Sequence, residues 1–338
     1  MTKRLEIAEE RPATAAGWDA VWAACPWSTY PQSRAWAEDW SAYTGGQMTP
    51  EPRLVRFSDG RRVVLPLTRQ RRRSGPRYLL TPAGNYGGWL SGEPLASAHA
   101  ELLVELLMQT FRPLWWRVNP FDPLAAVAAR HASLSEVTYV LALDRADELQ
   151  SGHRQHCQSV RKARRLGLRV RPAAAGAGEW HAYYDIYEAA LQRWGDDASS
   201  CYGPELFELL RRREGVELWV VEAPDGTVIS GAIALYARRH VALWHMATLA
   251  AHYRSRPTSL LIADLVRDAQ RRGLEWFDLN PSGGHEGVVE FKERVGAEPL
   301  ECPVIVAGPL PFAMAAGALQ RVRRGTRTRP RRARDVTG

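Results

Sequence analysis

Residues 276–296, WFDLNPSGGHEGVVEFKERVG, join an apolar strand pattern, a turn with two glycines and a helical pattern that carries a lysine. This residue, Lys292, is one of only three lysines among 45 basic residues, beside Lys3 and Lys162. In such a chain a retained lysine favours a site that needs a compact amine, because arginine serves wherever charge alone is required. An ammonium at this position can stabilise a developing oxyanion or neutralise a departing oxygen, which is the chemistry of acyl transfer.

The turn before the helix offers further reactive groups. Asp278 ends the strand and is a candidate for orienting an acceptor amine, or it caps the turn without a catalytic role. His285 is a candidate proton relay. A serine hydrolase is not indicated, because no G-x-S-x-G elbow surrounds the turn's serine. The glycines permit positive φ or close approach of a substrate, and an ordinary turn accommodates them equally well. The substrate-binding candidates in this turn are Asn280, Ser282, Gly283 and Gly284.

The periodicity of apolar residues and the positions of glycine and proline predict the elements that hold these groups. The order of elements recurs after roughly one domain length, which favours two copies of one mixed α/β unit over a single large sheet. We predict helices at 14–24, 33–43, 97–111, 121–130, 152–166, 178–194, 204–213, 257–272 and 286–295, and strands at 53–57, 61–67, 77–81, 114–118, 135–143, 217–222, 228–236, 240–247, 275–279 and 300–306.

In this plan antiparallel strands come first in each half and a strand-helix-strand crossover follows, as in the GNAT acyltransferase fold. We expect an N-terminal GNAT-like domain at 1–150, a second at 151–306, and a C-terminal helix with an arginine-rich, mobile tail at 307–338. Each domain is expected to be a mixed, mostly antiparallel sheet flanked by helices. With 338 residues, the chain exceeds the length at which one core usually stops growing.

Several segments resemble FemABX-type proteins, which are tandem-GNAT transferases. Members of this group include peptidoglycan enzymes that transfer amino acids from aminoacyl-tRNA and acyltransferases that use other donors. No charged helical hairpin lies between 195 and 257, where some members carry a coiled-coil arm, so a compact member is implied. The arginine-rich tail is not a general family feature. The resembling segments are WSTYPQSRAWAEDW (27–40), VVLPLTRQ (63–70), SVRKARRLGLRV (159–170), YYDIYEAALQRWG (183–195), HYRSRPTSLLIADLVRDAQRRGLEWFDL (252–279) and EGVVEFKERVGAEP (286–299).

The resemblance places Lys292 near the reacting ester, since FKERVG (291–296) resembles the family's F-K-x-x-[FWV]-G stretch. Phe291 either stacks on the terminal adenine of the RNA or is a core aromatic. The segment before the predicted helix at 257 lacks the glycine-rich turn that cradles the pyrophosphate of coenzyme A in GNAT enzymes, because Pro257 has no N–H to offer. The sequence therefore disfavours coenzyme A. Arg254 and Arg256 either pair with phosphates or are solvated.

Positive charge is concentrated in two segments. The tail from residue 321 holds eight arginines and one aspartate, a net of +7 out of +8 for the chain. It is either a phosphate-binding arm or a solubilising tail. The helix predicted at 152–166 contains no acidic residue, which favours phosphate binding over a merely solvated face. The RNA-binding candidates are Arg154, Arg161, Lys162, Arg164, Arg165, Arg254, Arg256, Arg323, Arg324 and Arg327.

The remaining features narrow the class of protein. Trp194, Trp244 and Tyr86 either line an acceptor pocket or pack in the core. The four cysteines, without C-x-x-C spacing, are expected to be small buried hydrophobes, and no metal site is predicted. No apolar run approaches the length of a membrane span and the N-terminus lacks a signal-peptide core, so we expect a cytoplasmic protein. The oligomeric state is not indicated.

These observations predict an amide-forming aminoacyltransferase with no cofactor, for which aminoacyl-tRNA is the co-substrate. The expected acceptor is the amine of a small molecule in specialised metabolism, such as antibiotic biosynthesis, or of a peptidoglycan precursor. Two alternatives stay open. One is an N-acyltransferase that uses acyl-CoA or an acyl carrier, and the other is an RNA-binding protein without activity.

Overall fold

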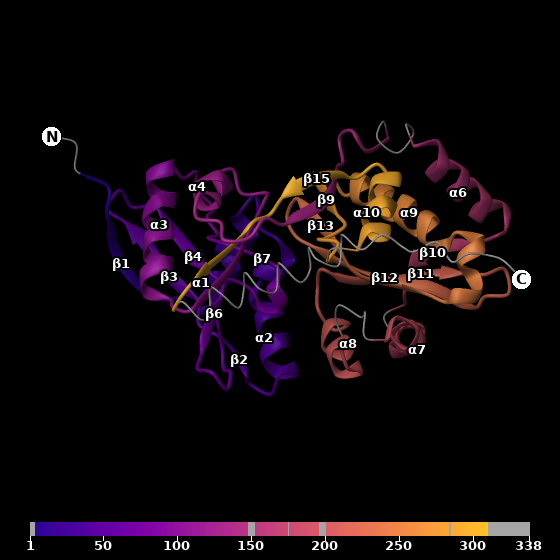
Figure 1. Ribbon diagram of the computed structural model, residues 1–338, viewed down its shortest axis with the longest axis horizontal. Helices are drawn as coiled ribbons and strands as arrows, with labels where there is room; N and C mark the ends of the chain where they lie inside the picture. Colours follow the sequence, from indigo (N-terminus) through magenta and orange to yellow (C-terminus); the bar gives the residue numbers. More distant parts are fainter. Residues whose placement is uncertain (1–3, 148–152, 175, 196–200, 284, 310–338) are drawn as a thin grey trace, which may run out of the picture.

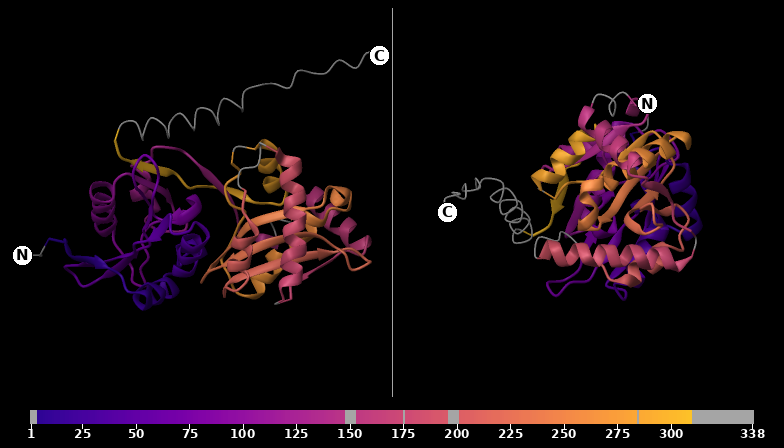
Figure 2. Two further views of the ribbon diagram at one scale, coloured as in Figure 1. Left: turned by 90° about the horizontal axis from the view of Figure 1, so that it is seen from below. Right: turned by 90° about the vertical axis from the view of Figure 1, so that its right-hand side faces the viewer.

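The computed structural model describes residues 4–147, 153–174, 176–195, 201–283 and 285–309. Two mixed α/β lobes lie side by side, as Figure 1 and the left view of Figure 2 show. This arrangement confirms the predicted fold of two GNAT-like units, each built on a mixed sheet with flanking helices.

The N-terminal lobe contains two sheets, one of three strands and one of six. The first has the order β1-β3-β4, and the second has the order β16-β8-β6-β5-β2, with β7 pairing β8. Its elements are β1 (Ile7–Pro12), α1 (Ala15–Ala24), α2 (Arg34–Tyr43), β2 (Met48–Pro50), β3 (Arg53–Phe57), β4 (Arg62–Leu65), β5 (Thr68–Gln70), β6 (Arg77–Leu79), β7 (Tyr86–Gly87), α3 (Ser97–Thr110), β8 (Leu114–Val118) and α4 (Ala125–Ala129).

The C-terminal lobe is built on a seven-stranded sheet of order β10-β11-β12-β13-β14-β9-β15. Helices α6, α9 and α10 lie on one side of this sheet, and α7 and α8 lie on the other (Figure 1). Its elements are β9 (Val137–Ala142), α6 (Arg154–Arg165), β10 (Arg169–Pro172), α7 (Ala177–Trp194), α8 (Pro204–Leu210), β11 (Val216–Glu222), β12 (Val228–Tyr236), β13 (His240–Thr248), a 3-10 helix η4 (Ala250–Ser255), α9 (Pro257–Arg271), β14 (Trp276–Asp278), α10 (Glu286–Arg294) and β15 (Glu298–Glu301).

The lobes exchange strands. β9, from the first half of the sequence, pairs antiparallel with β14 and β15 of the second lobe. The last strand, β16 (Val304–Ala307), returns to pair with β8 of the first lobe. Figure 1 shows the chain running back between the lobes after β15. The predicted boundary at residue 150 therefore does not divide the two sheets, and the single strand predicted at 300–306 is two strands in different lobes.

Side chains also join the lobes on the side of α2 and α8. Arg213 forms an ion pair of 2.6 Å with Asp39, whose side chain is only 1% exposed. Burial raises the pKa of Asp39, and the Arg213 guanidinium opposes that rise. Trp36 of α2 meets Trp244 of β13 edge to face, with ring centroids 5.3 Å apart. The aromatic and charged contacts together tie the two lobes into one unit.

Comparison with the predicted elements shows where local pattern was sufficient. The long periodic helices, among them α3, α7 and α9, lie within a residue or two of their predicted bounds. Five short strands were missed, because strands of two to six residues carry too little periodicity to be recognised. The missed strands are β1, β2, β5, β7 and β10.

Two smaller findings concern the membrane and the cysteines. Among the described helices, none combines the length and the apolar character that crossing a bilayer requires. All four cysteines are free; Cys25 and Cys302 are buried as predicted, whereas Cys157 is half-buried. The prediction was wrong for Cys201, which is exposed.

Candidate active site

Lys292 is the most unusual ionisable group on the second lobe, since its side chain is buried although it carries an amine. The residue is 6% exposed, and its Nζ donates a hydrogen bond to the carbonyl oxygen of Asn280. The ammonium also lies over the Tyr139 ring, 5.7 Å from the centroid. Burial lowers the pKa of Lys292 to about 8, and the negative charge of Asp278 limits the fall. A helix on one side of the sheet thus delivers a cation to the end of β14.

The carbonyl that receives Lys292 belongs to a residue in the left-handed region. Asn280 has φ of +59°, which asparagine tolerates better than most residues. Its side-chain Nδ2 donates to the Leu243 carbonyl oxygen at 2.6 Å, and its backbone N–H donates to Asp278 Oδ1 at 2.8 Å. These two bonds fix the turn, and the turn aims the Asn280 carbonyl at Lys292.

Asp278 holds this turn from within the protein. It is fully buried, and its Oδ1 also accepts a hydrogen bond of 2.7 Å from Thr138 Oγ1 of β9. Its Oδ2 lies 3.3 Å from His240 Nε2 at the start of β13. Because the carboxylate has no exposed surface, its geometry suits the positioning of the turn better than contact with an acceptor amine. That role remains a prediction.

The strands around the turn separate just beside it. β13 and β14 pair in parallel only from His240 to Ala242, opposite Trp276 to Asp278. Beyond this pairing the Asn280 side chain joins the two strands. On its other edge β13 has a bulge at Trp244, because Ile233 pairs with His245 and Ala234 with Leu243. A bulge bends a strand and re-aims its side chains, and here it accompanies the divergence from β14.

Tyr86 approaches this cluster from the other lobe. Its ring lies in β7, the residue is 3% exposed, and burial raises the pKa of its hydroxyl, with the negative charge of Asp278 adding to the rise. Trp244 is half-buried and stacks on Tyr202, with ring centroids 5.3 Å apart. The structure therefore brings Tyr86 near Asp278 but leaves Trp244 in an aromatic contact between the lobes.

The remainder of the turn is more open. Gly283 has φ of +61° and is exposed, and the ring of His285 is exposed at the residue that precedes α10. Ser282 is 9% exposed, and its Oγ lacks a hydrogen-bond partner. Gly284 lies outside the described residues. His285 and Ser282 thus border the turn, while Lys292, Asn280 and Asp278 form its buried interior.

Two other aromatic candidates have different positions. Phe291 is half-buried and packs against the hydrophobic core beneath α10, which favours the core alternative for this residue. Trp194 is the last residue of α7. The structure does not describe its side chain.

The start of α9 matches the expectation that it lacks a glycine-rich phosphate loop. Arg256, with φ of +63°, precedes Pro257, the first residue of the helix. Thr258 lies close enough for its hydroxyl to meet that of Thr248 at 3.3 Å. Arg254 and Arg256 are both exposed at this end of the helix. The region is positively charged but offers no N–H group at position 257.

A basic surface lies on α6. Arg154, Arg161, Lys162 and Arg165 are exposed, and the helix has no acidic residue in its first turn. Arg164 differs from these, because it pairs with Asp264 of α9 at 2.8 Å. The tail candidates Arg323, Arg324 and Arg327 lie outside the described residues.

Three participants in the cluster were not singled out in the sequence. Thr138 and Tyr139 belong to β9, which the chain order assigns to the first domain, and His240 begins β13. Only the exchange of strands brings β9 beside β14, so no local signal marks these residues. Within the described part of the chain, no group of three or more His, Cys, Asp or Glu side chains is arranged to hold a metal ion.

Comparison with known proteins agrees with this geometry. Residues 150–293 match the sequence model of the acetyltransferase (GNAT) domain. The structure of FemX superimposes with a TM-score of 0.68 at 14% identity, covering 88% of this chain and 96% of FemX. L-PGS from Bacillus licheniformis gives 0.54 at 10% identity, covering 80% and 88% of the two chains.

A third similar structure is the C-terminal domain of a putative lysylphosphatidylglycerol synthetase from Agrobacterium fabrum. It gives a TM-score of 0.53 at 12% identity, covering 75% of this chain and 84% of that domain. At these identities the structures establish a shared fold. A search of curated protein sequences found no match.

Proposed function

We propose that this chain, an N-acyltransferase of the FemABX-type tandem-GNAT superfamily, moves an amino acid from an aminoacyl-tRNA to the amine of a small acceptor. The observation that carries the proposal is the buried Lys292 ammonium, held on the Asn280 carbonyl where β13 and β14 diverge. The acceptor is an amine of a specialised metabolite or of a peptidoglycan precursor.

The proposed reaction needs alignment and charge stabilisation more than covalent help from the enzyme. The acceptor nitrogen attacks the ester carbonyl carbon, and the carbonyl oxygen takes the negative charge of the tetrahedral intermediate. When the C–O bond to the ribose breaks, the amide forms and the proton lost by the amine ends on the ribose oxygen. A desolvated ammonium stabilises such an oxyanion more strongly than one in water. Lys292 has the burial and the charge for this role.

The donor assignment rests on the entrance to α9 and on the charge of α6. An acyl-CoA enzyme of this fold needs backbone N–H groups for the pyrophosphate, and Pro257 removes one at the first position of the helix. The exposed basic residues of α6, with Arg254 and Arg256, suit a polyanion that extends over more surface than a nucleotide. An amino acid esterified to tRNA is already activated, so it satisfies both features.

The test incubates the purified full-length chain with bulk tRNA, aminoacyl-tRNA synthetases, one radiolabelled amino acid at a time and a cell extract as the source of acceptor. We expect a labelled amide whose formation stops when ribonuclease is added first. A labelled amide that survives ribonuclease and depends on acyl-CoA instead would assign the acyl-CoA reaction. Binding of tRNA without any amide product would assign the RNA-binding alternative.

Replacing both Arg161 and Arg165 by alanine is expected to weaken tRNA binding about tenfold near 0.1 M salt, since each lost phosphate contact releases fewer counterions. The plot of log affinity against log salt should become shallower by about 1.5. Filter binding across a salt series measures both. The control is Arg130→Ala, an exposed arginine at the end of α4. An unchanged salt slope in the double variant contradicts a role of α6 in binding RNA.

A further inference from the structure

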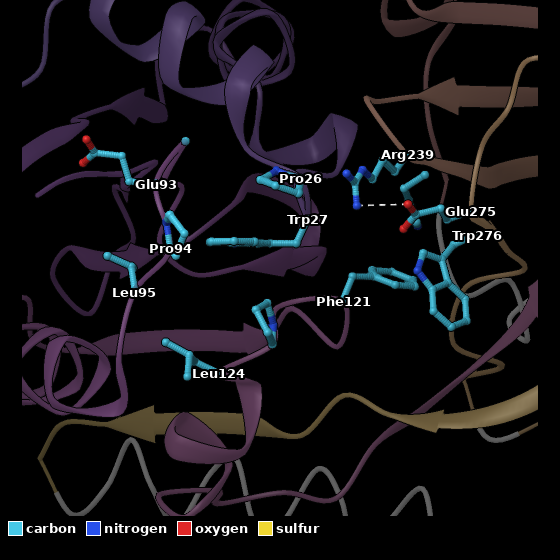
Figure 3. A pocket seen from close by; sticks show the side chains of 13 residues that line it. Pro26, Trp27, Glu93, Pro94, Leu95, Phe121, Leu124, Arg239, Glu275 and Trp276 are labelled. Carbon is cyan, nitrogen blue, oxygen red and sulfur yellow. Dashed lines mark ion pairs between the residues drawn. The ribbon is translucent and has the colours of Figure 1, made fainter.

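A second hollow lies between the lobes at the opposite end of β14 from Lys292. It has a volume of about 380 Å³ and is bordered by the first residues of β13 and β14, by the segment after α1 and by the loop that leads to α4. Figure 3 shows side chains of both lobes facing each other across it. Its size falls within the range of small-molecule sites, which begins at about 300 Å³.

The walls of this interlobe pocket are flat and apolar. Trp27, Phe121 and Trp276 contribute aromatic rings, and the Phe121 and Trp276 ring centroids are 5.7 Å apart. Three prolines and two leucines complete the apolar surface, namely Pro26, Pro94, Pro123, Leu95 and Leu124. Rigid aromatic and pyrrolidine faces favour a planar ring, which gains contact area with little loss of conformational freedom.

The polar groups around the interlobe pocket already have partners. Arg239 pairs with Glu275 at 3.0 Å, and Figure 3 shows this ion pair at the rim. Glu93 accepts a hydrogen bond from the Arg62 backbone N–H at 3.3 Å. His240, which lies at the inner wall, is bonded through Nε2 to Asp278. A ligand therefore finds no unpaired charge here to balance a charge of its own, and a neutral molecule fits best.

The pocket is formed before any ligand binds. Arg238 donates hydrogen bonds from the second lobe to the carbonyl oxygens of Ala23 and Ala24 at the end of α1. With the Arg213–Asp39 ion pair on the other side, these bonds hold the lobes at a fixed separation. A preformed site costs little free energy of reorganisation when a ligand enters.

We infer that the interlobe pocket is a binding site for a neutral small molecule with a flat aromatic ring, distinct from the site of acyl transfer. None of its lining residues is part of the Lys292–Asn280 contact, and β14 separates the two. His240 is the single side chain that borders the pocket and also contacts Asp278. The ligand is held by both lobes, and its binding does not depend on the proposed transfer reaction.

The test follows 5-fluoroindole by fluorine NMR as the full-length chain is added. We expect saturable line broadening with the wild type, and at least about tenfold weaker binding of the anion 5-fluoroindole-3-acetate, because the walls offer no unpaired cation. Leu95→Trp fills the pocket from its wall and is expected to weaken binding of 5-fluoroindole at least about tenfold.

The matched control is Leu166→Trp, which adds the same side chain at an exposed position on the far end of α6. It should leave binding unchanged, and thermal melting of both variants reports whether they fold. If Leu95→Trp does not fold, Trp276→Ala replaces it as a variant that removes one aromatic wall. Absence of binding to the wild type at millimolar probe, or equal binding by the folded pocket variant, overturns the inference.

Discussion

Replacing Lys292 by methionine is expected to lower the rate of amide formation by about 10²-fold or more, the effect of removing one oxyanion donor. Methionine keeps the length and apolar stem of lysine, so the fold should persist. The measurement is single-turnover transfer from purified aminoacyl-tRNA, with tRNA affinity determined in parallel. A loss in rate with unchanged affinity supports the catalytic role, whereas turnover near that of the wild type removes Lys292 from the mechanism.

The same substitution is expected to raise the free energy of unfolding by about 2 kcal/mol at neutral pH. Burial lowers the pKa of Lys292 to about 8 from 10.5, which corresponds to a cost of about 3 kcal/mol for holding the charged form. Loss of the bond to the Asn280 carbonyl returns about 1 kcal/mol of that gain. Urea unfolding of the two proteins measures the difference.

The sign of the pH dependence follows from the lowered pKa of Lys292. Below pH 8 the amine is protonated in both the folded and the unfolded chain, so the cost of burying the charge is present in full. Between pH 8 and 10.5 the unfolded chain binds more protons, and the stability contributed by Lys292 rises with pH. The advantage of the methionine variant should therefore shrink across this window. An advantage that stays constant to pH 10.5 contradicts the assignment of a buried ammonium.

Replacing Arg213 by methionine is the second large expected effect, a loss of about 3 kcal/mol or more in the free energy of unfolding. The substitution leaves Asp39, at 1% side-chain exposure, as a buried carboxylate without its counter-ion. Removing one partner of a buried ion pair costs more than the pair itself contributes, because the remaining charge is uncompensated. Burial already raises the pKa of Asp39, so the loss should diminish as the pH falls and this carboxyl is protonated.

The neighbouring Arg212 supplies the control for that measurement. Its side chain is 67% exposed and lies 3.8 Å from Glu208, and an exposed pair of this kind contributes at most about 1 kcal/mol. Arg212→Met should therefore unfold at nearly the same urea concentration as the wild type. Equal stability of the Arg212 and Arg213 variants would show that the ion pair between the lobes is not a determinant of their association.

The fold and much of the candidate site could be recognised before the structure, for physical reasons. Helices such as α7 and α9 carry a long apolar periodicity, and that pattern is a property of neighbouring residues. The rarity of lysine marked Lys292, because composition alone shows which positions did not become arginine. The turn with its glycines and the proline at the start of α9 were equally visible, since backbone restrictions act within a few residues.

What only the tertiary structure decided depends on contacts between distant segments. Thr138 is 140 residues from Asp278 in the chain, and it reaches that carboxylate because β9 crosses into the second lobe. The burial that lowers the pKa of Lys292 comes from packing against Tyr139 and the end of β14. The interlobe pocket combines side chains from four separate segments. The sequence by itself determined which groups are capable of chemistry, and the strand exchange determined which of them meet, because hydrogen bonds and desolvation depend on distance in space.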